Sequence, residues 1–215
     1  KGWKVGNIGD IAKNRKQTIK PNQIPSGTVY VGLEHVSRKT IMLHDFGFSD
    51  GLGSNKLCFN KNDILFGKLR PYFHKVSVAP FDGVCSTDIL SIYAKDDDFY
   101  GYLTLQLFSE RLIEYVTQSS NGTKMPRTNW SDISKYAIVI PPSSVARHFT
   151  NIIKGFINYM QNNSLENRKL SKIRDTLLPK LMSGEIRVPV DQEYTQESQQ
   201  QLMAAESSAE YKTIP

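Results

Sequence analysis

The chain has 215 residues, 39% of them hydrophobic, and carries 27 basic and 21 acidic side chains for a formal net charge of +6. That length suits one globular domain with an appendage, or two small domains. The sequence contains no run of 18 apolar residues, so no membrane span is expected. Its two cysteines cannot form a disulfide framework or a four-ligand zinc site, and we expect them to be buried thiols in a cytoplasmic protein.

The charge is unevenly distributed along the chain. Residues 188–215 hold one lysine against five acidic residues, a net −4, so the first 187 residues hold 26 basic against 16 acidic residues, a net +10. A folded part that is this basic suits a polyanionic partner, although many soluble proteins carry a similar charge on a solvated surface.

The first region, residues 1–142, is predicted to be an α+β domain with a mixed β-sheet and a few helices. Short segments rich in Val, Ile, Tyr and Phe, separated by Gly, Pro, Asn and Asp, predict strands at 28–36, 56–59, 63–66, 74–79, 84–94 and 135–140. One helix is expected after the carboxylates of residues 96–98, which suit a helix N-terminus, and it should end at 119–122. A short helical turn is expected at 130–133.

The second region, residues 143–183, is predicted to be one long helix. Apolar residues recur there at near-helical spacing, and no proline occurs before Pro179. About 40 helical residues span roughly 60 Å, more than a domain of 142 residues can cover, so the apolar stripe should pair with another helix in an antiparallel coiled coil. The residues predicted to form this dimerisation face are Phe149, Ile153, Phe156, Met160, Leu170, Leu177 and Leu181.

The middle of this helix, residues 161–169, is polar, whereas the contact face between two helices of a coiled coil should be apolar. A buried asparagine there could fix the register of a coiled coil. Two alternatives stay open: this stretch faces water, or it is a break between two helices. The C-terminal segment, residues 184–215, is predicted to be mostly a disordered polar tail.

Patterns typical of catalysis are missing from the sequence. None of the four histidines stands at metal-ligand spacing to another, and neither a Gly-x-Ser-x-Gly motif nor a phosphate-binding loop occurs. A metal-dependent nuclease would need a Glu-x-Lys triplet or a similar one on the strand after an acidic residue, and the lysine that follows Asp88, Lys95, does not complete one. The segment 140-IPPS-143 has the two prolines of an amino-methyltransferase motif but lacks its flanking polar and aromatic groups. We therefore predict a chain with no catalytic residues, no metal and no cofactor of its own.

Two basic loops are the candidate binding elements, 67-GKLRPYFHKV-76 and 122-GTKMPRTNW-130. Arginine can donate two hydrogen bonds to a phosphate or a guanine edge, and loops with cations and small donors suit DNA backbone and bases together. Tyr72 and Phe73 are expected to pack beneath the first loop. The alternative is a solvated basic surface. The predicted DNA contacts are Lys68, Arg70, Lys124 and Arg127, with Thr123 and Asn129 as further candidates.

The order of several motifs resembles the DNA specificity subunits of type I restriction–modification systems. The segments that carry the resemblance are 2-GWKVGNIGDIA-12, 63-DILFGKLRPYFHKV-76, 85-CSTDIL-90, 122-GTKMPRTNW-130, the IVIPP run ending at residue 142, and 177-LLPKLMSGEIRV-188. The resemblance implies a target recognition domain followed by a spacer helix, in a subunit that reads one half of a split site on double-stranded DNA.

The resemblance also implies partners. Separate modification and restriction subunits would carry out methylation and cleavage, and the modification subunit would use S-adenosylmethionine. Family members usually hold two domain–helix pairs. This chain could therefore be the C-terminal half of a longer subunit, as the missing initiator Met suggests, or a half-length subunit that forms a homodimer through its helix. We favour the homodimer, because the apolar stripe has no other partner within the chain. A coiled-coil assembly protein with an incidental basic surface is the alternative function.

Overall fold

The computed structural model describes residues 2–120 and 125–187, which divide into two compact units, residues 2–168 and residues 169–187. The predicted tail from residue 188 onward lies outside the described residues, as do Thr123 and Lys124. Across the described residues, no helix has both the length and the hydropathy needed to cross a bilayer.

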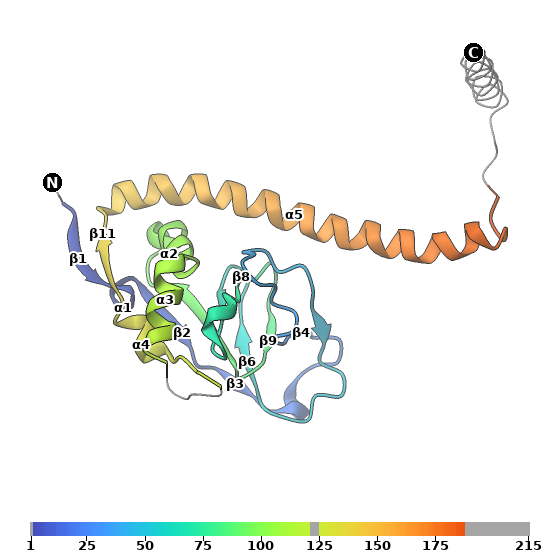
Figure 1. Ribbon diagram of the computed structural model, residues 1–215, viewed down its shortest axis with the longest axis horizontal. Coiled ribbons are helices and arrows are strands. Elements are labelled where there is room, and N and C mark those ends of the chain that lie inside the picture. Colours follow the sequence, from blue (N-terminus) through green and yellow to red (C-terminus); the bar gives the residue numbers. More distant parts are fainter. Residues whose placement is uncertain (1, 121–124, 188–215) are drawn as a thin grey trace, which may run out of the picture. The chain divides into compact units, whose positions relative to one another are not determined.

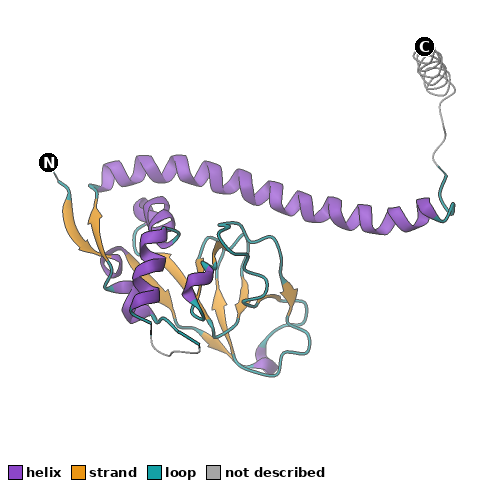
Figure 2. Ribbon diagram, viewed as in Figure 1, coloured by secondary structure: helices purple, strands orange, loops and turns teal. Residues whose placement is uncertain are grey.

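The first unit is built on mixed β-structure, as predicted (Figure 2). Antiparallel β1 and β11 join the two ends of the domain. A second, antiparallel sheet has the order β2-β10-β7-β8, and a third has the order β3-β6-β9-β4-β5 with β4 and β9 parallel. The strands are β1 Lys4–Asn7, β2 Ala12–Arg15, β3 Thr18–Ile19, β4 Val29–Val31, β5 Gly47–Phe48, β6 Lys56–Phe59, β7 Ile64–Gly67, β8 Val76–Val78, β9 Gly83–Cys85, β10 Ile89–Ala94 and β11 Ala137–Ile140.

Helix α2 packs against β7 and β10, α3 packs against α2 and α4, and both helices lie in the same unit as the beginning of α5 (Figure 1). The helices are α1 Ile8–Ile11, α2 Tyr100–Leu107, α3 Glu110–Gln118, α4 Trp130–Ser134 and α5 Ser143–Met182, with 3-10 turns η1 Pro21–Gln23, η2 Pro71–Phe73 and η3 Asp97–Phe99.

Two predicted elements are divided in the structure. The expected strand at 84–94 is β9 and β10, separated by a turn in which the backbone N–H of Ile89 donates to the carbonyl of Ser86 at 3.0 Å. The expected single helix is α2 and α3, because Ser109 accepts a hydrogen bond from the backbone of Leu112 and starts a new helix. A serine of this kind is a strong N-cap and outweighs the continuous apolar spacing.

Strand β7 explains why an apolar run precedes the first basic loop. Ile64 and Phe66 point into the core beneath α2 and α3, whereas Leu65 points into the second core, around Phe59 and Cys85. Successive side chains alternate between the two faces of a strand, so a strand covered on both faces reads as a continuous apolar segment.

The first part of α5 packs on its own domain. Thr150 accepts a hydrogen bond from the backbone N–H of Gly101 at 2.9 Å and donates to the carbonyl of Asp98 at 2.7 Å. A Cβ at position 101 would lie 2.9 Å from the Cα of Thr150, so only glycine allows this approach. The residues of α5 that are buried are Ala146, Thr150, Ile157, Gln161 and Ser164.

The polar middle of α5 is explained by contacts within the domain. His44 Nδ1 lies 2.8 Å from Ser164 Oγ, and Arg168 pairs with Asp45 at 3.1 Å while stacking on the ring of Phe46 at 3.7 Å. The helix is continuous from Ser143 to Met182, so a break at 161–169 is excluded. The second unit begins at residue 169, and α5 continues in it as far as Met182.

Candidate nucleic-acid interface

The first basic loop is a fixed turn rather than an open loop. Arg70 and His74 both have left-handed backbones, with φ of 48° and 51°, and they bracket the 3-10 turn η2. Such conformations are strained for residues other than glycine and persist where the surroundings enforce them. The backbone of Gly67 donates to the carbonyl of Lys75 at 2.8 Å, which closes the base of the turn.

The buried imidazole of His74 ties the turn to Phe108, the residue that follows α2. Its Nε2 lies 2.9 Å from the carbonyl oxygen of Phe108, and because a carbonyl only accepts, Nε2 is the protonated nitrogen. Burial lowers the pKa of His74, which favours the neutral ring. The histidine is therefore a structural residue, as expected from its lack of metal-ligand spacing.

The two predicted loops are joined backbone to backbone. Leu69 and Arg127 form an antiparallel bridge. On either side of it, the N–H of Arg70 donates to the carbonyl of Pro126 at 2.8 Å, and the N–H of Thr128 donates to the carbonyl of Lys68 at 3.0 Å. We call residues 67–75 and 125–129 together the loop pair.

Three predicted contacts, Lys68, Arg70 and Arg127, are thereby brought together in the loop pair. Burial lowers the pKa of Lys68, while nearby Asp88 opposes this shift. A phosphate placed against this half-buried ammonium would favour its charged form. Arg127 Nη2 donates to Asp88 Oδ1 at 2.9 Å.

Asn129, the remaining described candidate, precedes helix α4 at its N-cap position. Its backbone N–H donates to the carboxylate of Asp132 at 3.0 Å, and the residue is exposed. Asn7 and Asp10 make the same contact at 2.7 Å at the start of α1. This shared Asn-x-x-Asp pattern gives Asn129 a structural role at the edge of the loop pair.

The sequence interpretation missed Arg38. Its guanidinium carbon lies 3.7 Å from the ring centroid of Phe73, and Arg70 approaches the same ring at 5.9 Å. Phe73 packs in the loop as expected, but Tyr72 keeps 48% of its surface exposed, so the expectation that it packs beneath the loop is wrong. Arg38 reaches the turn because the N–H of Lys39 donates to the carbonyl of His74, a pairing that no local pattern reveals.

Asp63 has a structural role at the start of β7. Its carboxylate accepts hydrogen bonds from Arg15 at 2.8 Å, from Ser91 at 2.7 Å and from the backbone of Asn60 at 2.9 Å. It is 4% exposed, and these donors satisfy a buried carboxylate. Within residues 2–120 and 125–187, no group of three His, Cys, Asp or Glu side chains is placed to hold a metal ion.

Comparison with known proteins identifies the family. The model of the type I restriction modification DNA specificity domain matches residues 1–175. The chain belongs to this family.

The specificity domain has relatives across distant organisms. It is 28% identical to the type I restriction enzyme MjaIX specificity subunit of Methanocaldococcus jannaschii, over 87% of this chain and 45% of that protein. It is 25% identical to the EcoDI specificity subunit of Escherichia coli, over 83% of this chain and 40% of that protein. The chain therefore spans less than half the length of these curated relatives.

Solved structures agree on the fold of the specificity domain. The HsdS subunit from Thermoanaerobacter tengcongensis superposes with a TM-score of 0.58 at 19% identity, covering 84% of this chain and 47% of that one. The type I S subunit from M. genitalium gives 0.52 at 17% identity, covering 85% and 46%. At these identities the likeness concerns the fold.

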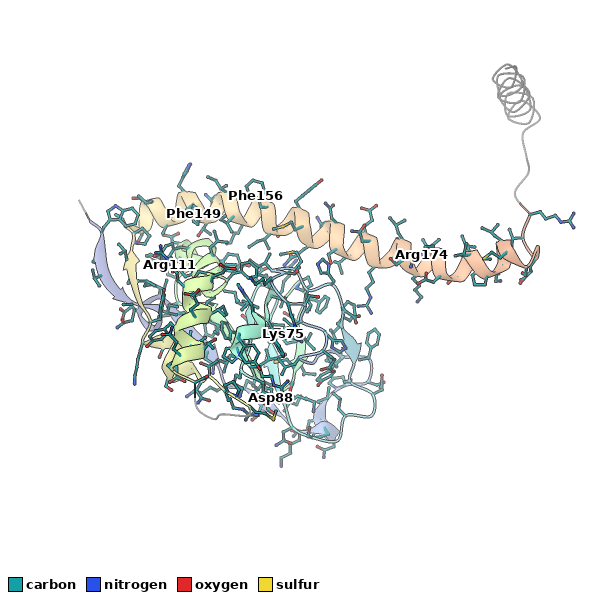
Figure 3. All side chains as sticks on the ribbon, in the orientation of Figure 1. Lys75, Asp88, Arg111, Phe149, Phe156 and Arg174 are labelled. Atoms are coloured by element: carbon teal, nitrogen blue, oxygen red, sulfur yellow. The ribbon has the colours of Figure 1, made fainter. Side chains whose placement is uncertain are left out.

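The predicted dimerisation residues on α5 differ in their burial. Ile153 packs against the core of its own domain, whereas Phe156 is 62% exposed. Phe149 and Phe156 lie along the part of α5 that belongs to the first unit (Figure 3). Further exposed residues of the predicted set are Met160, Leu170, Leu177 and Leu181.

The predicted set also keeps heptad spacing, but its member Ile153 packs on its own domain, and the exposed apolar residues in the first part of α5 form a neighbouring row. Val145, Phe149, Ile152, Phe156 and Tyr159 are separated alternately by four and three residues, the spacing of a coiled-coil seam. All five are exposed or half-buried. We call these five residues the α5 seam.

Proposed function

We propose that this chain is a sequence-specific recognition subunit for double-stranded DNA. It reads one half of a bipartite site and directs a partner methyltransferase and restriction nuclease to it. The observation that carries the proposal is the loop pair, in which Lys68, Arg70 and Arg127 of a DNA specificity domain are joined by backbone hydrogen bonds. Preorganised cations of this kind suit phosphates and base edges.

The chain contributes recognition and leaves chemistry to other subunits. Methyl transfer, with S-adenosylmethionine, belongs to the modification subunit, and cleavage belongs to the restriction subunit. The chain itself needs no cofactor for this role.

A second recognition half is supplied through α5. The α5 seam offers an apolar, heptad-spaced surface, and such a surface is stable when another helix covers it. A second copy of the chain, packed antiparallel, would place two identical domains around a two-fold axis, and the DNA halves would then be inverted repeats. Pairing with a different recognition half would give two unlike half-sites.

Selection of bound duplexes from a random pool, by the chain mixed with its modification subunit, tests the function. The expected result is a split motif with a fixed gap, and inverted halves would identify a homodimer. A stable oligomer that enriches no sequence would contradict the proposal and favour the coiled-coil assembly protein. Methyl transfer or metal-dependent cleavage by the purified chain alone would show it to be an enzyme.

A further inference from the structure

An acidic side chain, Asp88, lies beside the basic loop pair and contacts it. Asp88 Oδ1 lies 2.9 Å from Arg127 Nη2, and both side chains are partly exposed, 30% for Asp88 and 49% for Arg127. The backbone of Asp88 is also part of the arrangement, because its carbonyl accepts a hydrogen bond from the N–H of Lys68 at 2.8 Å. Lys68, Asp88 and Arg127 thus form one connected group.

A carboxylate at this place is unfavourable if the surface binds only phosphates. It repels the DNA backbone and cancels part of the charge of Arg127, which lowers affinity for every sequence equally. The ion pair between Asp88 and Arg127 adds little to the stability of the fold, because solvent-exposed ion pairs are weak. Neither phosphate binding nor stability therefore explains the position of Asp88.

Base recognition does explain it. A guanidinium has five N–H donors in a planar fork, and a carboxylate that holds one Nη leaves other donors free in a restricted orientation. The Cα of Arg127 is fixed as well, because Leu69 bridges it and its neighbours Pro126 and Thr128 are hydrogen-bonded to the first loop. Orienting a side chain before binding reduces the entropy lost on binding.

We propose that Arg127 reads a guanine edge in the major groove and that Asp88 is the positioning residue that aims it. A bidentate arginine–guanine contact uses the O6 and N7 acceptors, a pair of groups that distinguishes G·C from the other base pairs in that groove. Lys68, which is half-buried beside Asp88, then faces the phosphates. This inference rests on the proposed function, since it specifies how the loop pair reads DNA.

The test compares the wild type with Asp88→Asn, Arg127→Lys, Arg127→Ala and the double variant Asp88→Asn/Arg127→Ala. Each is measured for equilibrium binding at one salt concentration, with the duplex selected by the wild type and with its single-base-pair variants. Asparagine has the shape of aspartate without its charge, and lysine keeps the charge of arginine without its fork. A melting curve for each variant checks that it is folded.

The expected result is a loss of discrimination at one G·C position, on the order of 5- to 100-fold, in Asp88→Asn and in Arg127→Lys. Binding to unrelated duplexes should stay the same or rise. In the Arg127→Ala background, Asp88→Asn should have no further effect on that position, because the two residues act through one contact.

A uniform rise in affinity of Asp88→Asn for all duplexes, with discrimination unchanged at every position, would overturn the inference while leaving the proposed function intact. A wild type that shows no preference among duplexes would instead overturn the proposed function itself. The two failures are therefore distinguishable in the same set of measurements.

Discussion

The loop pair and the α5 seam are two surfaces of the first unit with opposite chemistry. The loop pair is basic, and backbone hydrogen bonds between segments distant in sequence hold its cations. The α5 seam is apolar and regular, and its spacing is visible in the sequence alone. Figure 3 shows Asp88, beside the loop pair, on the side of the domain opposite to Phe149 and Phe156.

This difference is the reason why we propose different partners for the two surfaces. A polyanion gains from fixed cations, since each neutralised phosphate releases counterions. An apolar helical stripe gains only when another apolar surface covers it. In the proposed function DNA binds at the loop pair and a partner helix at the α5 seam, and Figure 3 shows Asp88 well separated from Phe149 and Phe156.

The largest expected effect comes from placing charge in the α5 seam. Ile152→Asp together with Phe156→Asp should convert a dimer to a monomer in sedimentation experiments. Each apolar side chain lost should cost about 1.5–3 kcal/mol, counted twice because of the symmetry. Asn158→Asp, an added charge at another exposed position of the same helix, is the matched control and should leave the dimer intact. An unchanged dimer in the double variant would place the interface elsewhere.

The next effect separates packing within the domain from packing between chains. Ile157 is 2% exposed and belongs to the domain core, so Ile157→Ala should lower the free energy of unfolding by about 2–5 kcal/mol in urea titrations. Asn158→Ala, at the neighbouring exposed position, should change it by less than about 0.5 kcal/mol. Equal losses in both variants would mean that α5 does not pack through Ile157.

A smaller effect is expected for a single cation of the loop pair. Arg70→Ala should weaken DNA binding and reduce the slope of log affinity against log salt by about 0.9 if Arg70 contacts one phosphate. Arg174→Ala, which removes an exposed arginine from α5, is the control and should leave the slope unchanged. An unchanged slope and affinity in Arg70→Ala would remove this residue from the interface.

The smallest effect concerns acid sensitivity. The bidentate hydrogen bonds from Arg147 lower the pKa of Asp98 in the folded state below its ordinary value of 3.8. A carboxylate with a lowered folded pKa contributes stability above its unfolded pKa and loses it as the pH falls through the folded value. Arg147→Met should therefore unfold with a weaker pH dependence below about pH 4, as measured by denaturation at a series of pH values. An identical pH dependence would show that the pair contributes nothing.

The sequence predicted the elements whose signals are local. Strands β6 and β7 follow from apolar, β-branched and aromatic composition, and α5 follows from its periodicity. Strand β1 escaped prediction because the segment Lys4–Asn7 has no apolar alternation and becomes a strand only by pairing with β11 at the far end of the domain. Helix α1 has only 4 residues, too few to show a helical period. Tertiary pairing decides such short segments.

The candidate site was predictable in composition but not in geometry. Lys68, Arg70 and Arg127 stood out as cations beside Gly and Pro, yet the bridge between Leu69 and Arg127 depends on the whole fold. The contact of Arg38 with Phe73 had no local signal either. In the same way, the buried Gln161 and Ser164 looked like part of a polar seam, because sequence spacing cannot show which face of a helix meets its own domain.

The most direct test of the loop pair as a DNA-reading surface is a comparison of two variants that lose the same charge. One replaces Lys68, Arg70 and Arg127 with alanine, and the other replaces the exposed lysines Lys13, Lys16 and Lys20 with alanine. Both are measured for affinity toward the duplex that the wild type selects and toward a scrambled duplex. We expect the first variant to lose all preference for the selected duplex, while the second keeps its preference and binds both duplexes somewhat more weakly. Equal behaviour of the two variants would contradict the assignment of the loop pair.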